Sequence, residues 1–69
     1  MKGDRINVLV RDHVTQVAAS VSGRTVEATT EKEGGITWLV VREATRGGTI
    51  IHEARFQMTD VVMWEKHSA

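Results

Sequence analysis

Three histidines are the side chains of this sequence best suited to proton transfer or metal binding near neutral pH. They are His13, His52 and His67, far apart in the chain and without the paired spacing of a structural zinc site. We interpret His52 as the cross-strand partner of Glu43, and His67 as part of a frayed tail over residues 66–69. The sequence therefore predicts no metal site and no acid–base pair.

Nucleophilic catalysis is the second chemistry to consider, because Ser, Thr and Asp are plentiful. The sequence contains no nucleophile elbow and no phosphate-binding glycine loop that leads into a helix. The pairs Gly34-Gly35 and Gly47-Gly48 are typical of turns. We expect a non-catalytic protein without a cofactor.

Size and composition indicate how such a chain is stabilised. Its 69 residues predict one small β domain over residues 1–69, with a thin core. A domain of this size buries only about 60% of the surface that its unfolded chain exposes. The chain has no Cys for a disulfide, so self-association is the remaining common stabiliser. We expect a homodimer or a larger oligomer.

Charge and hydropathy exclude several classes of partner. Nine basic and nine acidic residues give a net charge of zero, without the positive field that attracts nucleic acid or an anionic membrane. The longest apolar runs, at 38–41 and 61–64, are too short to span a bilayer, and we expect no membrane association and no export. The lack of Cys favours a cytoplasmic location. Abundant Val, Thr, Ala, Gly and Arg suggest a bacterial or phage gene of high GC content.

The stretch from residue 14 to residue 30 is compatible with two structures. Its apolar residues fall at helical spacing, but they also alternate like two strands folded at Ser22-Gly23, with Val17 opposite Ala28. The stretch is rich in Val and Thr, which lose rotamer freedom in a helix, so we favour the hairpin. A helix at about 13–22, within an α+β fold, is the alternative.

The other segments predict further strands. Residues 5–11 form the first, followed by a turn at Asp12-His13. Residues 36–58 form a long hairpin folded at Gly47-Gly48, and the tight bend of residues 58–60 leads into a last strand at 61–66. Counting outward from the glycine pair, the predicted cross-strand pairs are Ala44 with Ile51, Glu43 with His52, Arg42 with Glu53, Val41 with Ala54, and Leu39 with Phe56.

These segments add up to an all-β meander of five to six antiparallel strands, curled into a small barrel or roll. The strand order, with a bend just before a short final strand, resembles the plan of SH3-like and Sm-like barrels. That resemblance covers most of the chain but involves no specific motif. It implies a binding scaffold rather than a chemistry.

The second face of the long hairpin predicts an interaction surface. Trp38 must point away from Leu39, toward a face that mixes apolar and charged residues. Either another wall of the barrel covers Trp38, or the face is a subunit or partner interface, because Trp and Arg are enriched among residues that dominate binding energy. The last strand is apolar on both sides, which favours pairing with a second copy. The candidate contacts are Trp38, Val40, Ile51, Arg55, Val62 and Trp64.

The sequence therefore predicts a non-catalytic module that self-associates and binds a protein partner, as an accessory protein of a bacterium or phage. The alternative is a small barrel that binds single-stranded nucleic acid, because such barrels combine basic and aromatic residues. Interleaved glutamates argue against a continuous basic stripe. The candidate residues for this alternative are Arg11, Arg24, Arg42, Arg46 and Arg55.

Overall fold

The computed structural model describes residues 4–19 and 23–67. The chain is all-β in these ranges, as predicted, and its one helical element is a single turn of 3₁₀-helix, η1 (Met58–Asp60). The strands are β1 (Arg5–Val10), β2 (His13–Ala18), β3 (Thr25–Glu33), β4 (Ile36–Ala44), β5 (Ile50–Gln57) and β6 (Val61–His67).

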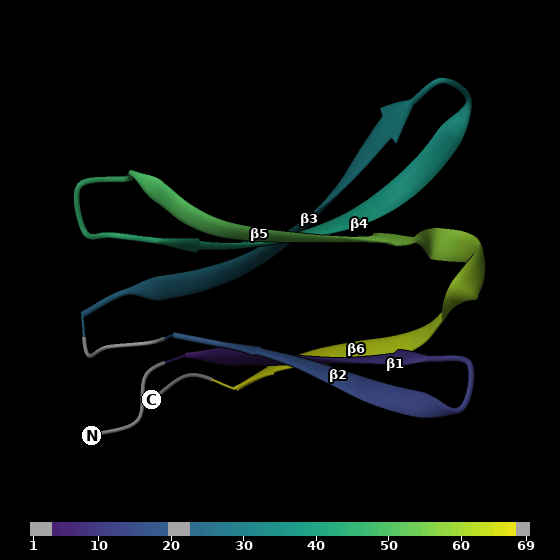
Figure 1. Cartoon of the computed structure of the whole chain (residues 1–69), viewed down its shortest axis with the longest axis horizontal. Coiled ribbons are helices and arrows are strands. Elements are labelled where there is room, and N and C mark those ends of the chain that lie inside the picture. The colour runs from purple at the N-terminus through teal and green to yellow at the C-terminus, as the bar shows by residue number, and fades with distance from the viewer. Residues whose placement is uncertain (1–3, 20–22, 68–69) are drawn as a thin grey trace.

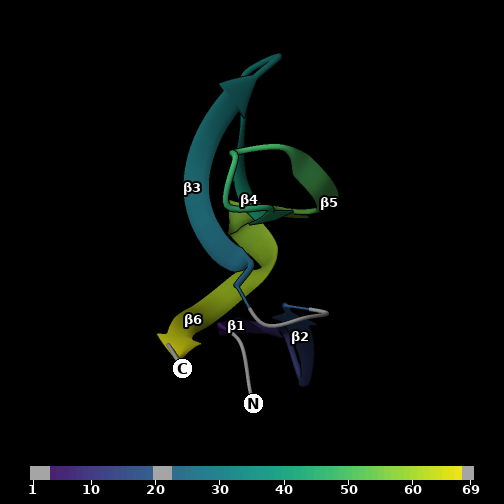
Figure 2. The same cartoon turned by 90° about the vertical axis from the view of Figure 1, so that its left-hand side faces the viewer.

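The six strands form two antiparallel sheets of three strands each (Figure 1). Sheet A has the order β2-β1-β6, and sheet B has the order β3-β4-β5. Within the described ranges the strands divide between these sheets and do not close into one continuous barrel. The turn η1 connects β5 of sheet B to β6 of sheet A. In both views the β3–β4 hairpin extends beyond the rest of the molecule (Figures 1 and 2).

The turn between β1 and β2 lies one residue earlier than predicted. Val10 pairs with His13, so the loop residues are Arg11 and Asp12. Arg11 has a φ of 57°, which is uncommon for a residue with a side chain. Its backbone N–H donates to the carbonyl of Asp60 at 3.1 Å, and its Nη2 donates to Oδ1 of Asp60 at 3.0 Å. These two contacts with η1 hold the turn in place.

The prediction that the strands on either side of Ser22-Gly23 pair with each other is wrong. Residues 13–18 form a strand, so the helix alternative is also wrong there, but β2 pairs with β1 and not with β3. Val17 lies opposite Ile6 instead of Ala28. The pattern was misleading because alternation shows which face is buried and does not show which strand is the partner. Residues 20–22 lie outside the described ranges.

The predicted register of the β4–β5 hairpin is confirmed from Glu43 opposite His52 outward to Leu39 opposite Phe56. Next to the turn the pairing differs, because Ala44 pairs with Ile50 and not with Ile51.

The loop at the end of this hairpin explains the difference. It has three residues, Arg46 to Gly48, and the backbone N–H of Thr45 donates to Thr49 at 2.9 Å. Gly48 adopts a φ of 91°, as expected for the left-handed position of a three-residue hairpin loop. Ile51 is then an extra residue, a β-bulge, which restores the predicted register.

Two glycines form the tight turn between β3 and β4. Gly34 and Gly35 have φ values of 60° and 78°, and the flanking Glu33 and Ile36 are paired. Positive φ at both central residues characterises a type I′ turn, which matches the twist of the strands that it joins.

The last strand pairs with the first, and Arg5 lies opposite His67. Because β6 includes Lys66 and His67, the predicted frayed tail over 66–69 is wrong for these two residues. Residues 68 and 69 lie outside the described ranges. A register shift beside Val10 makes Val62 a bulge residue in β6.

The core lies between the two sheets and consists of alternate residues from four strands. Its buried members are Ile6, Val8, Val17, Val26, Leu39 and Val41. Burying one such side chain stabilises the fold by about 1.5–3 kcal/mol. Phe56, the cross-strand partner of Leu39, packs against this cluster and is partly buried.

Candidate interaction surfaces

The three histidines lie on three different strands, β2, β5 and β6. His13 is 3.5 Å from its neighbour Asp12, and His67 is 3.1 Å from Glu65. His52 lies opposite Glu43, as predicted. Across residues 4–19 and 23–67, no three His, Cys, Asp or Glu side chains gather closely enough to hold a metal ion.

A buried carboxylate that the sequence pattern did not predict, Glu43, lies beside the core. Glu43 shares the inward face of β4 with Leu39 and Val41, and its side chain is only 5% exposed. Nη1 of Arg24 lies 3.7 Å from its Oε2. A buried charge needs such compensation to avoid a large desolvation cost. The sequence contains an indication of this burial, because Leu39, Val41 and Glu43 occupy every second position of β4 and must therefore point to the same face.

The outward face of sheet B brings Trp38 and Arg55 together, as the sequence suggested. The guanidinium carbon of Arg55 lies 5.6 Å from the centre of the Trp38 ring, within the range of a cation–π contact. Val40 lies directly opposite Arg55 and on the same face of β4 as Trp38, but it is fully buried, so its side chain is not available as a contact. We attribute this burial to the long side chains that flank Val40 on the same face.

A charge network surrounds this pair. Arg42 donates from Nε to Oε1 of Glu53 at 2.6 Å and from Nη2 to Oε2 of Glu31 at 2.8 Å. The hydrogen bond from Arg42 lowers the pKa of Glu53, and the bonds to Glu53 and Glu31 raise the pKa of Arg42. Arg55 is 3.7 Å from Glu31 and 3.8 Å from Glu33, distances beyond hydrogen bonding.

The arginines that were considered for nucleic-acid binding do not form a continuous basic surface. Arg11, Arg24, Arg42 and Arg55 each lie within 4 Å of a carboxylate, and Arg46 lies beside Gly23 at the β4–β5 turn. A phosphate contact with any of the first four would therefore have to displace or share an existing ion pair.

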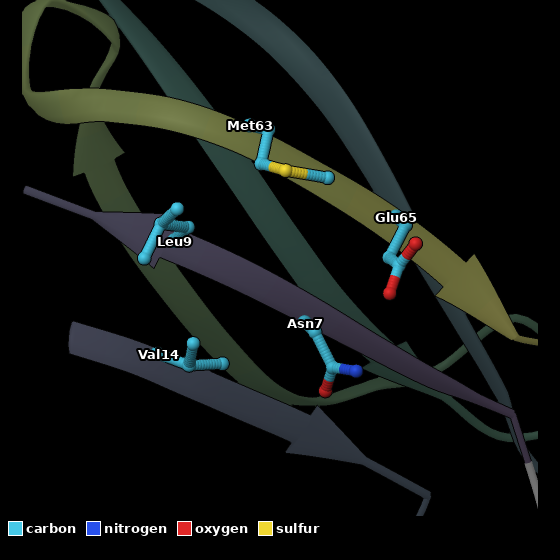
Figure 3. A pocket seen from close by; sticks show the side chains of 5 residues that line it. All are labelled: Asn7, Leu9, Val14, Met63 and Glu65. Atoms are coloured by element: carbon cyan, nitrogen blue, oxygen red, sulfur yellow. The ribbon is translucent and has the colours of Figure 1, made fainter. Parts of the chain in front are cut away.

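The outward face of sheet A carries an apolar surface that the sequence analysis did not propose. Leu9 pairs with Val14 on one side and Met63 on the other, so these three side chains form one row across the sheet. They line an open hollow together with Asn7 and Glu65 (Figure 3). We name the row Val14, Leu9 and Met63 the apolar row. The sequence feature that indicates this row is Leu9, a large apolar residue that points to the opposite face of β1 from Val8 and Val10.

A polar row runs beside the apolar row. Asn7 pairs with Gln16 on one side and Glu65 on the other. Nε2 of Gln16 donates to Oδ1 of Asn7 at 2.9 Å, which fixes both amides. The hollow therefore combines apolar side chains with an exposed carboxylate at one end.

The six predicted contact residues do not form a single surface. Trp38, Val40 and Arg55 lie on sheet B with Ile51 at its edge, whereas Val62 and Trp64 belong to β6 of sheet A. Val62 is 63% exposed at its bulge, and Trp64 is 40% exposed on the same side of the sheet as Val8.

Comparison of the chain with known protein families, with curated proteins and with solved structures gave no match. In the described part of the chain, no helix has the length and apolar character needed to cross a membrane.

Proposed function

We propose that this protein is a non-catalytic interaction module of the cytoplasm that self-associates and binds a protein partner through the outward face of sheet A. The observation that carries the proposal is the apolar row, because Val14 is 62% exposed and Met63 is 52% exposed beside Leu9. Contiguous exposed apolar side chains tend to mark a contact site.

The partner of this face is a protein segment that presents a large apolar side chain beside a basic one. The apolar side chain would fill the hollow between Leu9, Val14 and Met63. Glu65, at the end of the hollow, is more than half exposed and can accept hydrogen bonds from Lys or Arg.

Selection of peptides from a random library on the immobilised protein tests the proposal. We expect the selected peptides to combine a large apolar residue with an adjacent Lys or Arg. Their affinity, measured by fluorescence anisotropy, should fall about tenfold or more in the Val14→Lys variant, because a charge would then occupy the row.

Val62→Lys is the matched control, since Val62 is the same residue type at nearly the same exposure but lies outside the apolar row. It should retain the affinity. Peptides that bind equally well to the wild type and to Val14→Lys would contradict the assignment of this face.

A further inference from the structure

The outer edge of β5 is open for backbone pairing. Sheet B has the order β3-β4-β5, so no described strand occupies the far side of β5, which Figure 2 shows on the side of β4 remote from β3. The bulge at Ile51 lies near the start of the strand, and pairing with β4 is regular from His52 to Gln57. An open, regular edge strand is a template for another strand.

Two identical strands related by a two-fold axis can pair only antiparallel, with one residue facing its own copy. On β5, a centre at Ala54 places Glu53 of each chain opposite Arg55 of the other. Centres at Glu53 or Arg55 instead place like charges opposite each other. The charges of β5 therefore select one register for self-pairing.

At this register the charged side chains of sheet B continue into the second copy with alternating sign. Arg42 and Glu53 face each other within sheet B, and Arg42 pairs on its other side with Glu27. A second copy would extend the row Glu27, Arg42, Glu53 with its own Arg55, so that the charges alternate. The guanidinium of Arg55 lies over the Trp38 ring, and its distances to Glu31 and Glu33 on β3 are longer than hydrogen bonds. To reach Glu53 of a second copy, the Arg55 side chain has to turn from this position toward the open edge.

The other edges of the two sheets fit self-pairing less well. The register that uses all of β3 places Glu27 opposite Glu31 of the copy. The edge of β6 is interrupted by the bulge at Val62, and bulges are a recognised protection of sheet edges. β2 has six residues and no pair of opposite charges.

We infer that a second copy of this chain pairs with β5 antiparallel about Ala54, joining two copies of sheet B into one six-stranded sheet with a Glu53–Arg55 ion pair on each side of the axis. This inference rests on the self-association in the proposed function and specifies its geometry. It does not depend on the apolar row of sheet A.

Cysteine cross-linking tests the register directly, because the natural chain contains no Cys. Residues that face each other in an antiparallel pair have Cα atoms about 4.5–5.5 Å apart, within disulfide range. Ala54→Cys should therefore form covalent dimers under mild oxidation, detected on a non-reducing gel. The control Gln57→Cys, on the same strand but three residues from the axis, should remain monomeric on the gel.

A third variant separates failure of this inference from failure of the proposed self-association. Met63→Cys, on β6, would cross-link if that edge pairs instead. Cross-linking of Met63→Cys without Ala54→Cys would overturn the β5 register and leave self-association intact. A wild-type chain that sediments as a monomer at the highest soluble concentration would overturn both, while the peptide selection on sheet A would still stand.

Charge reversal gives an independent test by sedimentation analysis. Glu53→Lys and Arg55→Glu should each raise the dimer dissociation constant about tenfold, because each opposes like charges twice. When the two variants are mixed, both contacts become complementary again, so a heterodimer of near wild-type affinity should form. Folded variants whose mixture shows no recovery would overturn the register.

Discussion

Glu43 occupies the position on β4 where an apolar core residue would be expected, and this carboxylate is almost fully buried. The nearby guanidinium of Arg24 offsets part of the cost of removing the charge from water. Arg24 precedes β3, so the ion pair joins the start of one strand to the end of its neighbour.

Removal of this cation should destabilise the fold. We expect Arg24→Ala to lower the free energy of unfolding by about 2 kcal/mol, because a buried carboxylate then loses a compensating charge. Arg24→Lys should recover part of the loss. Urea denaturation measures both changes.

Arg46→Ala is the control, because it removes an arginine at an exposed turn and should lower the free energy of unfolding by less than about 0.5 kcal/mol. Equal losses of stability in Arg24→Ala and Arg46→Ala would refute the role of Arg24.

At the residue scale, the sequence identified the Trp38–Arg55 pair but not the burial of Val40. Alternation along one strand places Trp38, Val40 and Arg42 on one face. It does not show how far neighbouring long side chains will lie over a small residue between them. The apolar row was missed for a related reason, because Val14, Leu9 and Met63 come from three separate strands whose pairing was not known.

At the scale of single elements, the β4–β5 hairpin was predictable because two independent signals agreed. The glycine pair marked the turn, and opposite charges marked the register. The bulge at Ile51 then compensated for the longer loop. The partner of β2 was not predictable. Val17 would face the core whether β2 paired with β1 or with β3, and the alternation of apolar residues does not show which of the two strands is the partner.

The β3–β4 turn allows a clean test of backbone conformation. A Cβ atom at Gly34 would meet nothing within 4 Å, so any effect of a side chain there comes from its φ of 60°. We expect Gly34→Val to cost about 1–2 kcal/mol in thermal or urea unfolding. Gly34→Asn should change stability by less than about 0.5 kcal/mol, since Asn tolerates this region.

Gly47 provides the comparison for that test. Its φ is not positive, and an added Cβ would make only an ordinary contact, 3.9 Å from Oγ1 of Thr45. Gly47→Val should therefore cost less than Gly34→Val. If Gly47→Val lost more stability than Gly34→Val, the positive φ of Gly34 would not be what determines the cost of a side chain in these turns.

At the scale of the whole molecule, the protein is flat, with extents of 35 × 25 × 13 Å. Its Cα radius of gyration is 12.2 Å, compared with about 11 Å for a compact domain of this length. Two sheets of three strands leave four edges and two broad outward faces. The open β5 edge and the apolar row belong to these exposed parts, and these are the two places where we propose contacts.

The distribution of charge over the molecule also predicts weak affinity for nucleic acid. The net charge is zero, and four of the five candidate arginines already contact carboxylates. We expect fluorescence anisotropy of a labelled single-stranded oligonucleotide to show no salt-dependent binding, even at low ionic strength. Binding that weakens steeply as salt is added would restore the nucleic-acid hypothesis.

The pairing of β1 with β6 has a consequence for how the protein acquires its fold during synthesis. β1 is the first described strand to leave the ribosome and β6 is the last, yet Arg5 lies beside His67. The hairpins of sheet B can form while translation continues, because their partners are close in sequence. Sheet A can be completed only once β6 has emerged, so the final stage of folding follows translation of the last strand.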